Sequence, residues 1–147
     1  MTEHMIDNKP LSILLVDDDP LVLRAMAREL RGYRLRTASS MERAAAALER
    51  DAVDVVMTDF DMPGGDGVAL LELVRRTHPA TRRVLMSGDP PSSLGALRLA
   101  GVVECFVAKP FRQPLAQLLE PLVRQPAAPR RRRTRERVPR VAASAPN

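Results

Sequence analysis

Two groups of carboxylates stand where apolar, strand-like runs of this chain end. The run Val53–Thr58 leads directly into Asp59, and the run Leu11–Val16 leads into Asp17–Asp19. Both runs are short and apolar, which is typical of parallel strands that are buried on both faces. Neighbouring parallel strands lie about 4.8 Å apart and end at the same edge of a sheet. We therefore expect these carboxylates to lie within several ångströms of one another.

Such a cluster of carboxylates is unstable without a cation. At roughly 5 Å and an effective dielectric constant near 20, each like-charged pair costs on the order of 3 kcal/mol. A divalent cation removes this repulsion, and hard oxygen ligands of this number suit Mg²⁺. The pattern therefore predicts a magnesium site formed by Asp59 and carboxylates of the Asp17–Asp19 cluster.

A lysine and a hydroxyl group follow two further strand-like runs. Only two of the 23 basic residues are lysines, and one of them, Lys109, stands between the run Val102–Ala108 and Pro110. Another strand-like run begins at Arg82 and ends in the hydroxyl of Ser87. A lysine ammonium is a compact point charge, which suits a phosphoryl oxygen or a carboxylate. We expect the carboxylates, the hydroxyl and the ammonium to converge at one edge of the sheet.

In their order and context these positions resemble the receiver domain of two-component response regulators. The resemblance covers about Leu11 to Arg124. It implies that Asp59 is the phosphoacceptor, and that Asp17 and Asp18 hold Mg²⁺ directly or through water. It also implies that the backbone carbonyl of Asp61 completes the metal shell.

The same resemblance implies roles for the later residues. Ser87 matches the hydroxyl switch residue of the family, Phe106 its aromatic switch position, and Lys109 its invariant lysine, followed by the expected cis bond to Pro110. The chain departs from the family pattern in three ways. Ser87 replaces the commoner threonine, Phe106 lacks the phenol of the common tyrosine, and Asp61 adds a carboxylate near the path of a hydrolytic water.

The chain alternates strand-like and helix-like segments, which predicts an α/β fold. Strands are expected at about 11–16, 34–38, 53–58, 82–87 and 103–108, with helices between them. This order predicts a doubly wound, five-stranded parallel sheet with helices on both faces, flavodoxin-like and of the receiver type. At 147 residues, 45% of them apolar, the chain has the size of one compact domain.

Local signals mark the ends of the first helices. Asp19 as N-cap and Pro20 at the first helical position begin the first helix, and Gly32 ends it. The spacing Ser39-x-x-Glu42 predicts a capping box for the second helix, and the third follows Gly67.

The last two helices carry weaker signals. The fourth is expected to be marginal, because Pro90 and Pro91 delay it and Gly95 lies inside it. The fifth begins at about Arg112 and should be kinked or ended by Pro121.

The composition changes after residue 124. Residues 125–147 contain seven arginines and one glutamate, whereas residues 1–124 contain 16 basic and 17 acidic residues. The basic segment has no apolar periodicity, so we expect a disordered tail rich in Arg, Pro and Ala. The predicted organisation is an N-terminal extension (1–10), a receiver domain (11–124) and this tail (125–147).

The resemblance implies a sensor histidine kinase or a phosphotransfer protein as phosphodonor. It also implies an output partner on the face formed by the fourth helix, the fifth strand and the fifth helix. A single cysteine, with no apolar run of membrane length and no amino-terminal signal pattern, predicts a cytoplasmic protein without a membrane span.

Two other functions stay open at this stage. In one, the receiver controls an adaptor whose basic tail binds nucleic acid or an anionic surface. The tail has no aromatic residue, which argues against binding by stacking on bases, and we expect weak, sequence-independent binding at low salt. In the other, Asp59 and Asp61 resemble the nucleophile and the acid/base residue of haloacid-dehalogenase-type phosphatases, which also use Mg²⁺. That family carries its motif after the first strand, whereas here it follows the third.

Overall fold

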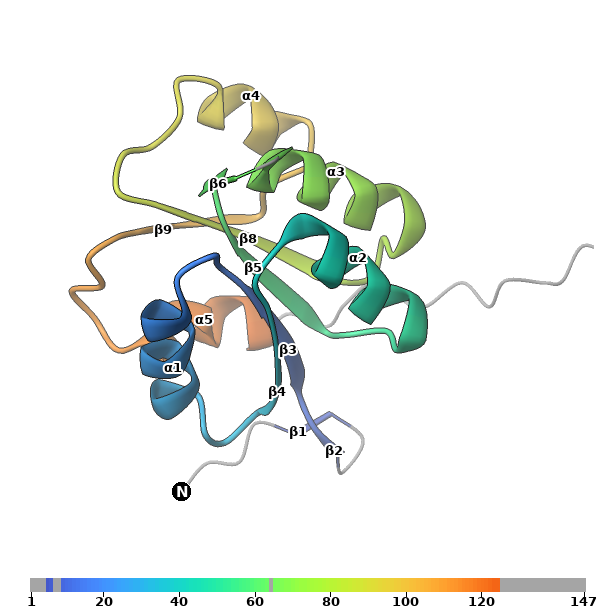
Figure 1. The fold of residues 1–147 in the computed structure, drawn as a ribbon, viewed down its shortest axis with the longest axis vertical. Helices are drawn as coiled ribbons and strands as arrows, with labels where there is room; N and C mark the ends of the chain where they lie inside the picture. The colour runs from blue at the N-terminus through green and yellow to red at the C-terminus, as the bar shows by residue number, and fades with distance from the viewer. Residues whose placement is uncertain (1–4, 7–8, 64, 125–147) are drawn as a thin grey trace, which may run out of the picture.

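The chain folds around a five-stranded parallel sheet (Figure 1). The structure is a computed structural model that describes residues 5–6, 9–63 and 65–124. The strand order is β4-β3-β5-β8-β9. The strands of this sheet are β3 (Ser12–Val16), β4 (Arg34–Ala38), β5 (Val55–Asp59), β8 (Arg82–Ser87) and β9 (Cys105–Ala108). Two short antiparallel pairs accompany it: β1 (Met5–Ile6) with β2 (Lys9–Pro10), and β6 (Asp61–Met62) with β7 (Gly65–Asp66).

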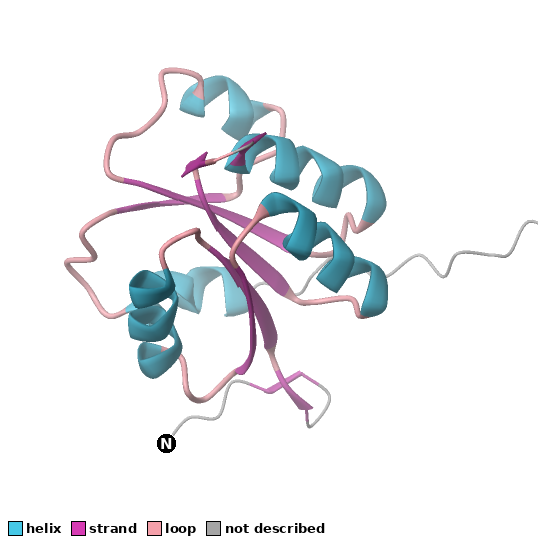
Figure 2. Cartoon of the chain, in the orientation of Figure 1, coloured by secondary structure: helices cyan, strands magenta, loops and turns pink. Residues whose placement is uncertain are grey.

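Helices cover both faces of the sheet, as Figure 2 shows. They are α1 (Pro20–Glu29), α2 (Met41–Arg50), α3 (Gly67–Thr77), α4 (Leu94–Leu99) and α5 (Leu115–Arg124). Alternate strand residues point to opposite faces, so each strand feeds two cores. Ile13 and Leu15 of β3 pack on the side of α1 and α5, while Leu14 and Val16 pack on the side of α2 and α3. The predicted fold class is confirmed.

Strand β4 forms one edge of this sheet. In the described part of the chain it pairs with β3 alone. The side chains of Arg34 and Arg36 are exposed, and Arg36 forms an ion pair with Asp51. Charged side chains of this kind are typical of natural sheet edges.

Most expected elements are present within one or two residues of the predicted bounds. The first helix begins as expected, because the Asp19 carboxylate accepts a hydrogen bond from the amide of Leu21 at 2.9 Å and Pro20 is the first helical residue. The peptide bond before Pro110 is cis, as expected. The third strand starts at Val55 rather than at residue 53, and it includes Asp59 as its last residue.

Two predictions about helix ends are wrong. The N-cap of α2 is Ser40 and not Ser39, since the hydroxyl of Ser40 accepts the amide hydrogen of Arg43 at 3.1 Å while Ser39 bonds only the guanidinium of Arg43. Helix α5 starts at Leu115 rather than at about Arg112, and Pro121 does not end it, since the helix continues to Arg124. The kink that was expected at Pro121 as the alternative stays a prediction. A proline at this position removes the hydrogen bond to the carbonyl four residues earlier, that of Gln117, a residue exposed to water.

Candidate phosphoacceptor and metal site

The register of the sheet brings the two acidic groups together. Val16 of β3 pairs with Thr58 of β5. The residues that follow this pair in the chain are both aspartates, Asp17 just after β3 and Asp59 at the end of β5. Asp17 is 1% exposed. One of its oxygens accepts the amide hydrogen of Asp19 at 2.9 Å, which fixes the orientation of the carboxylate. The carboxylates thus lie together at the carboxyl ends of neighbouring strands, as expected.

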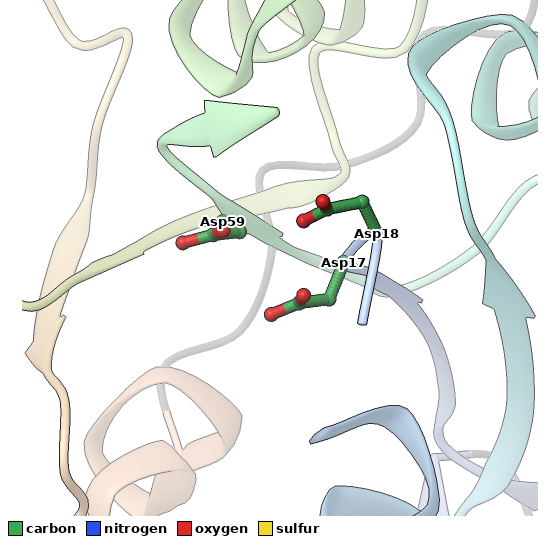
Figure 3. Close-up of side chains that lie close together, drawn as sticks. All are labelled: Asp17, Asp18 and Asp59. Carbon is green, nitrogen blue, oxygen red and sulfur yellow. The ribbon is translucent and has the colours of Figure 1, made fainter. Parts of the chain in front are cut away.

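Asp18 completes a group of three carboxylates. One oxygen from each of Asp17, Asp18 and Asp59 lies within 4.8 Å of the other two. Figure 3 shows the three side chains turned toward the same space at the ends of β3 and β5. Asp17 is buried, Asp59 is intermediate and Asp18 is exposed, so the group opens to solvent on the side of Asp18.

Lys109 reaches into this group from the end of β9. Its Nζ lies 2.6 Å from Oδ2 of Asp17 and 3.3 Å from Oδ1 of Asp59. The amide of Lys109 donates a hydrogen bond to the carbonyl of Ser87 at 2.9 Å, which holds this residue beside the end of β8. Three carboxylates and one ammonium leave a formal charge of -2.

The surroundings shift the protonation of two of these groups. Burial raises the pKa of Asp59, and the charges of Asp17 and Asp18 raise it further, while Lys109 opposes them. Burial lowers the pKa of Lys109, but its contacts with Asp17 and Asp59 raise it by more, so the net shift is upward. The lysine is therefore held in its charged form, and the Asp59 carboxylate is less stable than one on an ordinary surface.

The donor set fits a small divalent cation. Mg²⁺ binds oxygen at about 2.0–2.1 Å, so two ligands on opposite sides of the ion lie about 4.2 Å apart. The three oxygens lie within 4.8 Å of one another, which is close to this widest separation for two ligands of one ion. The formal charge of -2 matches the charge of the ion.

The remaining predicted residues surround the group without joining the carboxylates. Ser87 is the last residue of β8 and is 4% exposed. Phe106 of β9 is partly buried against the core on the α2 and α3 side. Asp61 is exposed, and its carboxylate is not part of the cluster. The expected metal contact of Asp61 is through its backbone carbonyl, and this stays a prediction.

Gly67 is a site residue that the sequence analysis did not identify. A Cβ atom at this position would lie 2.1 Å from the backbone oxygen of Asp59. Its amide donates to the carbonyl of Phe60 at 2.9 Å, and Asp66 caps the helix that begins here. The start of α3 therefore rests directly on the backbone of Asp59, which only a residue without a side chain permits. The position of Gly67 just after a helix-capping aspartate was the available signal.

The family model of the response regulator receiver domain matches residues 13–120. The chain belongs to this family. The match begins in β3 and ends in α5, so it includes all of the five-stranded sheet except Ser12, and every residue of the site described above.

Curated relatives share this domain as one part of longer proteins. The C4-dicarboxylate transport transcriptional regulatory protein DctD of Rhizobium meliloti is 35% identical over 104 residues, which cover 68% of this chain and 22% of that protein. The transcriptional regulatory protein GlrR of Escherichia coli is 30% identical over 138 residues, which cover 90% of this chain and 31% of that protein. The chain thus spans about a fifth to a third of the length of these relatives.

Solved receiver structures have the same fold. The signal receiver domain of an HD domain-containing protein from Pseudomonas fluorescens aligns with a TM-score of 0.71 and 27% identity, covering 81% of this chain and 90% of that one. A CheY-like receiver domain protein from Methanospirillum hungatei aligns with a TM-score of 0.69 at 24% identity, covering 76% of this chain and 90% of that one. The receiver is a signalling module of two-component systems. Across residues 5–6, 9–63 and 65–124, none of the helices has the length and apolar character that crossing a membrane requires.

Proposed function

We propose that Asp59 accepts a phosphoryl group from the phosphohistidine of a sensor histidine kinase or a phosphotransfer protein in the cytoplasm. The observation that carries this proposal is the position of the Lys109 ammonium, within 3.3 Å of Asp59 and 2.6 Å of Asp17. An incoming phosphoryl group brings negative charge to a partly buried carboxylate. A fixed ammonium beside that carboxylate stabilises the charge as it arrives.

Asp17, Asp18 and Asp59 would hold Mg²⁺, with the backbone carbonyl of Asp61 as a further ligand. The ion, when bound, supplies positive charge that neutralises the oxygens of the transferred group. Asp17 is fixed by the amide of Asp19 and by Lys109, so it offers a preformed oxygen ligand. No substrate other than the protein's own phosphoryl group is expected to be turned over.

Ser87 and Phe106 would carry the signal from the site to an output partner. The hydroxyl of Ser87 would bond the phosphoryl group, and Phe106 would then change its packing against the core between β9 and α4. Both residues lie close to Lys109. Ser87 of β8 pairs with Ala108 of β9, the residue before Lys109, and Phe106 lies three residues before Lys109 in the chain. The face of α4, β9 and α5 would be the surface that the partner reads. The basic tail would bind nucleic acid only weakly, and this segment lies outside the described residues.

Labelling with acetyl phosphate and Mg²⁺ tests the assignment of the acceptor. One phosphoryl group per chain should be added, and Asp59→Asn should abolish the labelling. Glu49→Gln makes the same change from carboxylate to amide at an exposed residue of α2, away from the cluster, and should still be labelled. Lys109→Gln should bind Mg²⁺ nearly as well as the parent and be labelled far more slowly. Equal labelling of the Asp59→Asn variant and the parent would refute the proposal.

A further inference from the structure

The N-terminal end of helix α4 lacks a side-chain cap, and the helix as a whole is short. It has no buried residue, and Ser93 at its N-cap makes no side-chain capping bond. Only Leu94 and Leu97 pack partly against the core on the α2 and α3 side. A helix of six residues without a cap or a buried face gains little stability of its own.

The other end of α4 is held firmly. Val102 and Val103, which follow the helix, are 4% and 1% exposed. Both of their amides donate to the carbonyl of Leu97, at 2.9 Å and 3.3 Å. Gly101 has a φ of +74°, a conformation that glycine adopts without strain, and this turns the chain from the helix into the core.

A buried arginine holds this turn. Arg83 lies on β8, four residues before Ser87, and is 7% exposed. Its Nη2 and Nε donate to the carbonyl of Gly101 at 2.9 Å and 3.3 Å. Its Nη1 donates to the carbonyls of Thr81 at 2.9 Å and Pro79 at 3.4 Å. Nη2 also lies 3.2 Å from a carboxylate oxygen of Glu104.

These contacts engage all three nitrogens of the guanidinium. A buried guanidinium that lost its partners would be costly, because it cannot give up its proton. Burial lowers the pKa of Arg83, and the neighbouring Arg75 and Arg82 add to this effect against Glu104. The guanidinium of Arg83 therefore connects the loop before β8 to the turn after α4, and the loss of any of these contacts would leave a buried donor without a partner.

We propose that Arg83 is a positioning residue that pins the C-terminal end of α4 to β8 through Gly101. Helix α4 then moves as a lever about Gly101, and its N-terminal end follows the segment that leaves Ser87. The pin is a property of the fold by itself. The movement on phosphorylation rests on the function proposed above, so the two parts are tested separately.

Amide hydrogen exchange on the full chain tests the pin. The amide of Leu97, which donates to the carbonyl of Ser93, reports on the first turn of α4, and those of Val102 and Val103 report on the pinned end. Leu97 should exchange at least about tenfold faster than Val102 in the parent. In Arg83→Met, exchange at Val102 and Val103 should accelerate at least about tenfold, with little change at Leu97.

Two further variants make this result specific. Arg76→Met removes an exposed guanidinium from the last turn of α3 and should change none of these amides. Arg83→Lys keeps the charge with fewer donors and should fall between the parent and Arg83→Met, and it decides the matter if Arg83→Met does not fold. Unchanged exchange at Val102 and Val103 in a folded Arg83 variant would overturn the pin.

Beryllofluoride with Mg²⁺, which imitates a bound phosphoryl group, tests the lever in the parent. Exchange at Leu97 should change several-fold, and exchange at Val102 and Val103 should stay within about twofold. Equal changes at both ends would overturn the lever. No change at any of these amides, together with failure of acetyl phosphate to label the chain, would refute the proposed function, and the Arg83 variants would still decide the pin.

Discussion

Replacing Asp59 by asparagine should stabilise the fold when no divalent cation is bound. At an effective dielectric constant of about 20, the Lys109 ammonium at 3.3 Å attracts the Asp59 carboxylate by about 5 kcal/mol. Asp17 and Asp18, within 4.8 Å, each repel it by about 3.5 kcal/mol on the same scale. Water screens the exposed Asp18, so attraction and repulsion nearly cancel and the burial of Asp59 decides the sign.

The raised pKa of Asp59 has the same meaning, since it shows that the ionised form is disfavoured in the fold. We expect Asp59→Asn to raise the free energy of unfolding by about 1 kcal/mol at pH 7, measured by urea unfolding in chelator. A fold that contains a carboxyl group with a raised pKa loses stability as the pH rises through the pKa of that group in the folded state. The difference between the two proteins should therefore shrink as the pH is lowered toward 3.8, the ordinary value for Asp59.

Mg²⁺ should reverse the order of the two proteins. An ion present at one hundred times its Kd adds about 2.7 kcal/mol to the stability of the parent, and the variant has lost one of the carboxylates that bind it. Glu49→Gln, which removes an exposed carboxylate of α2 outside the cluster, should stay within about 0.5 kcal/mol of the parent under both conditions. A lower stability of Asp59→Asn than of the parent in chelator would refute the proposed balance of charges.

Two more predictions concern the support of Asp59 and the tail. Gly67→Ala should destabilise the fold by about 3 kcal/mol in urea unfolding and slow labelling by acetyl phosphate about tenfold, because the new Cβ would meet the backbone of Asp59. Gly32→Ala is the control: a Cβ at Gly32 would have no atom within 4 Å, so this variant should be as stable as the parent. Normal labelling of Gly67→Ala would contradict the close contact. Truncation after Arg124 should leave the melting temperature and the labelling unchanged and remove a weak nucleic-acid affinity whose log-log salt slope is near about -4 to -5. Affinity that survives physiological salt, or changes several-fold on phosphorylation, would instead make the tail a regulated output.

The sequence predicted the position of the acidic group because each strand and the aspartate at its end are adjacent in the chain. An apolar run that ends in aspartate states both the strand and the residue at its end, so Asp17 and Asp59 could be placed before the register was known. The sequence also predicted that the Lys109 ammonium converges with these carboxylates, but its distances to Asp17 and Asp59 required the structure, since 50 residues separate Lys109 from Asp59. The family resemblance also supplied the roles of Ser87 and Phe106, which composition and spacing alone do not reveal.

Other features depend on choices that the sequence leaves undecided. Ser39 and Ser40 are both competent caps, and the backbone geometry selects Ser40. Pro121 is a strong local signal against a helix, yet α5 continues through it, because the buried Leu115 and Leu119 anchor the helix to the sheet. The burial of Arg83 was also not foreseen, since an arginine at the start of a strand is usually solvated and two of its partners, Gly101 and Glu104, lie about twenty residues away.

The exposed arginines of β4 bear on how copies of this chain meet. An edge strand offers a row of amide and carbonyl groups with which a strand of a second chain can pair. Apolar strands are vulnerable to such pairing while the chain folds. If two chains approached through β4, Arg34 and Arg36 of each would face their counterparts, and the ion pair of Arg36 with Asp51 would neutralise only part of that charge. The charge on β4 thus opposes the pairing of this strand with another copy of itself, so growth of the sheet into open-ended fibres is disfavoured at this edge.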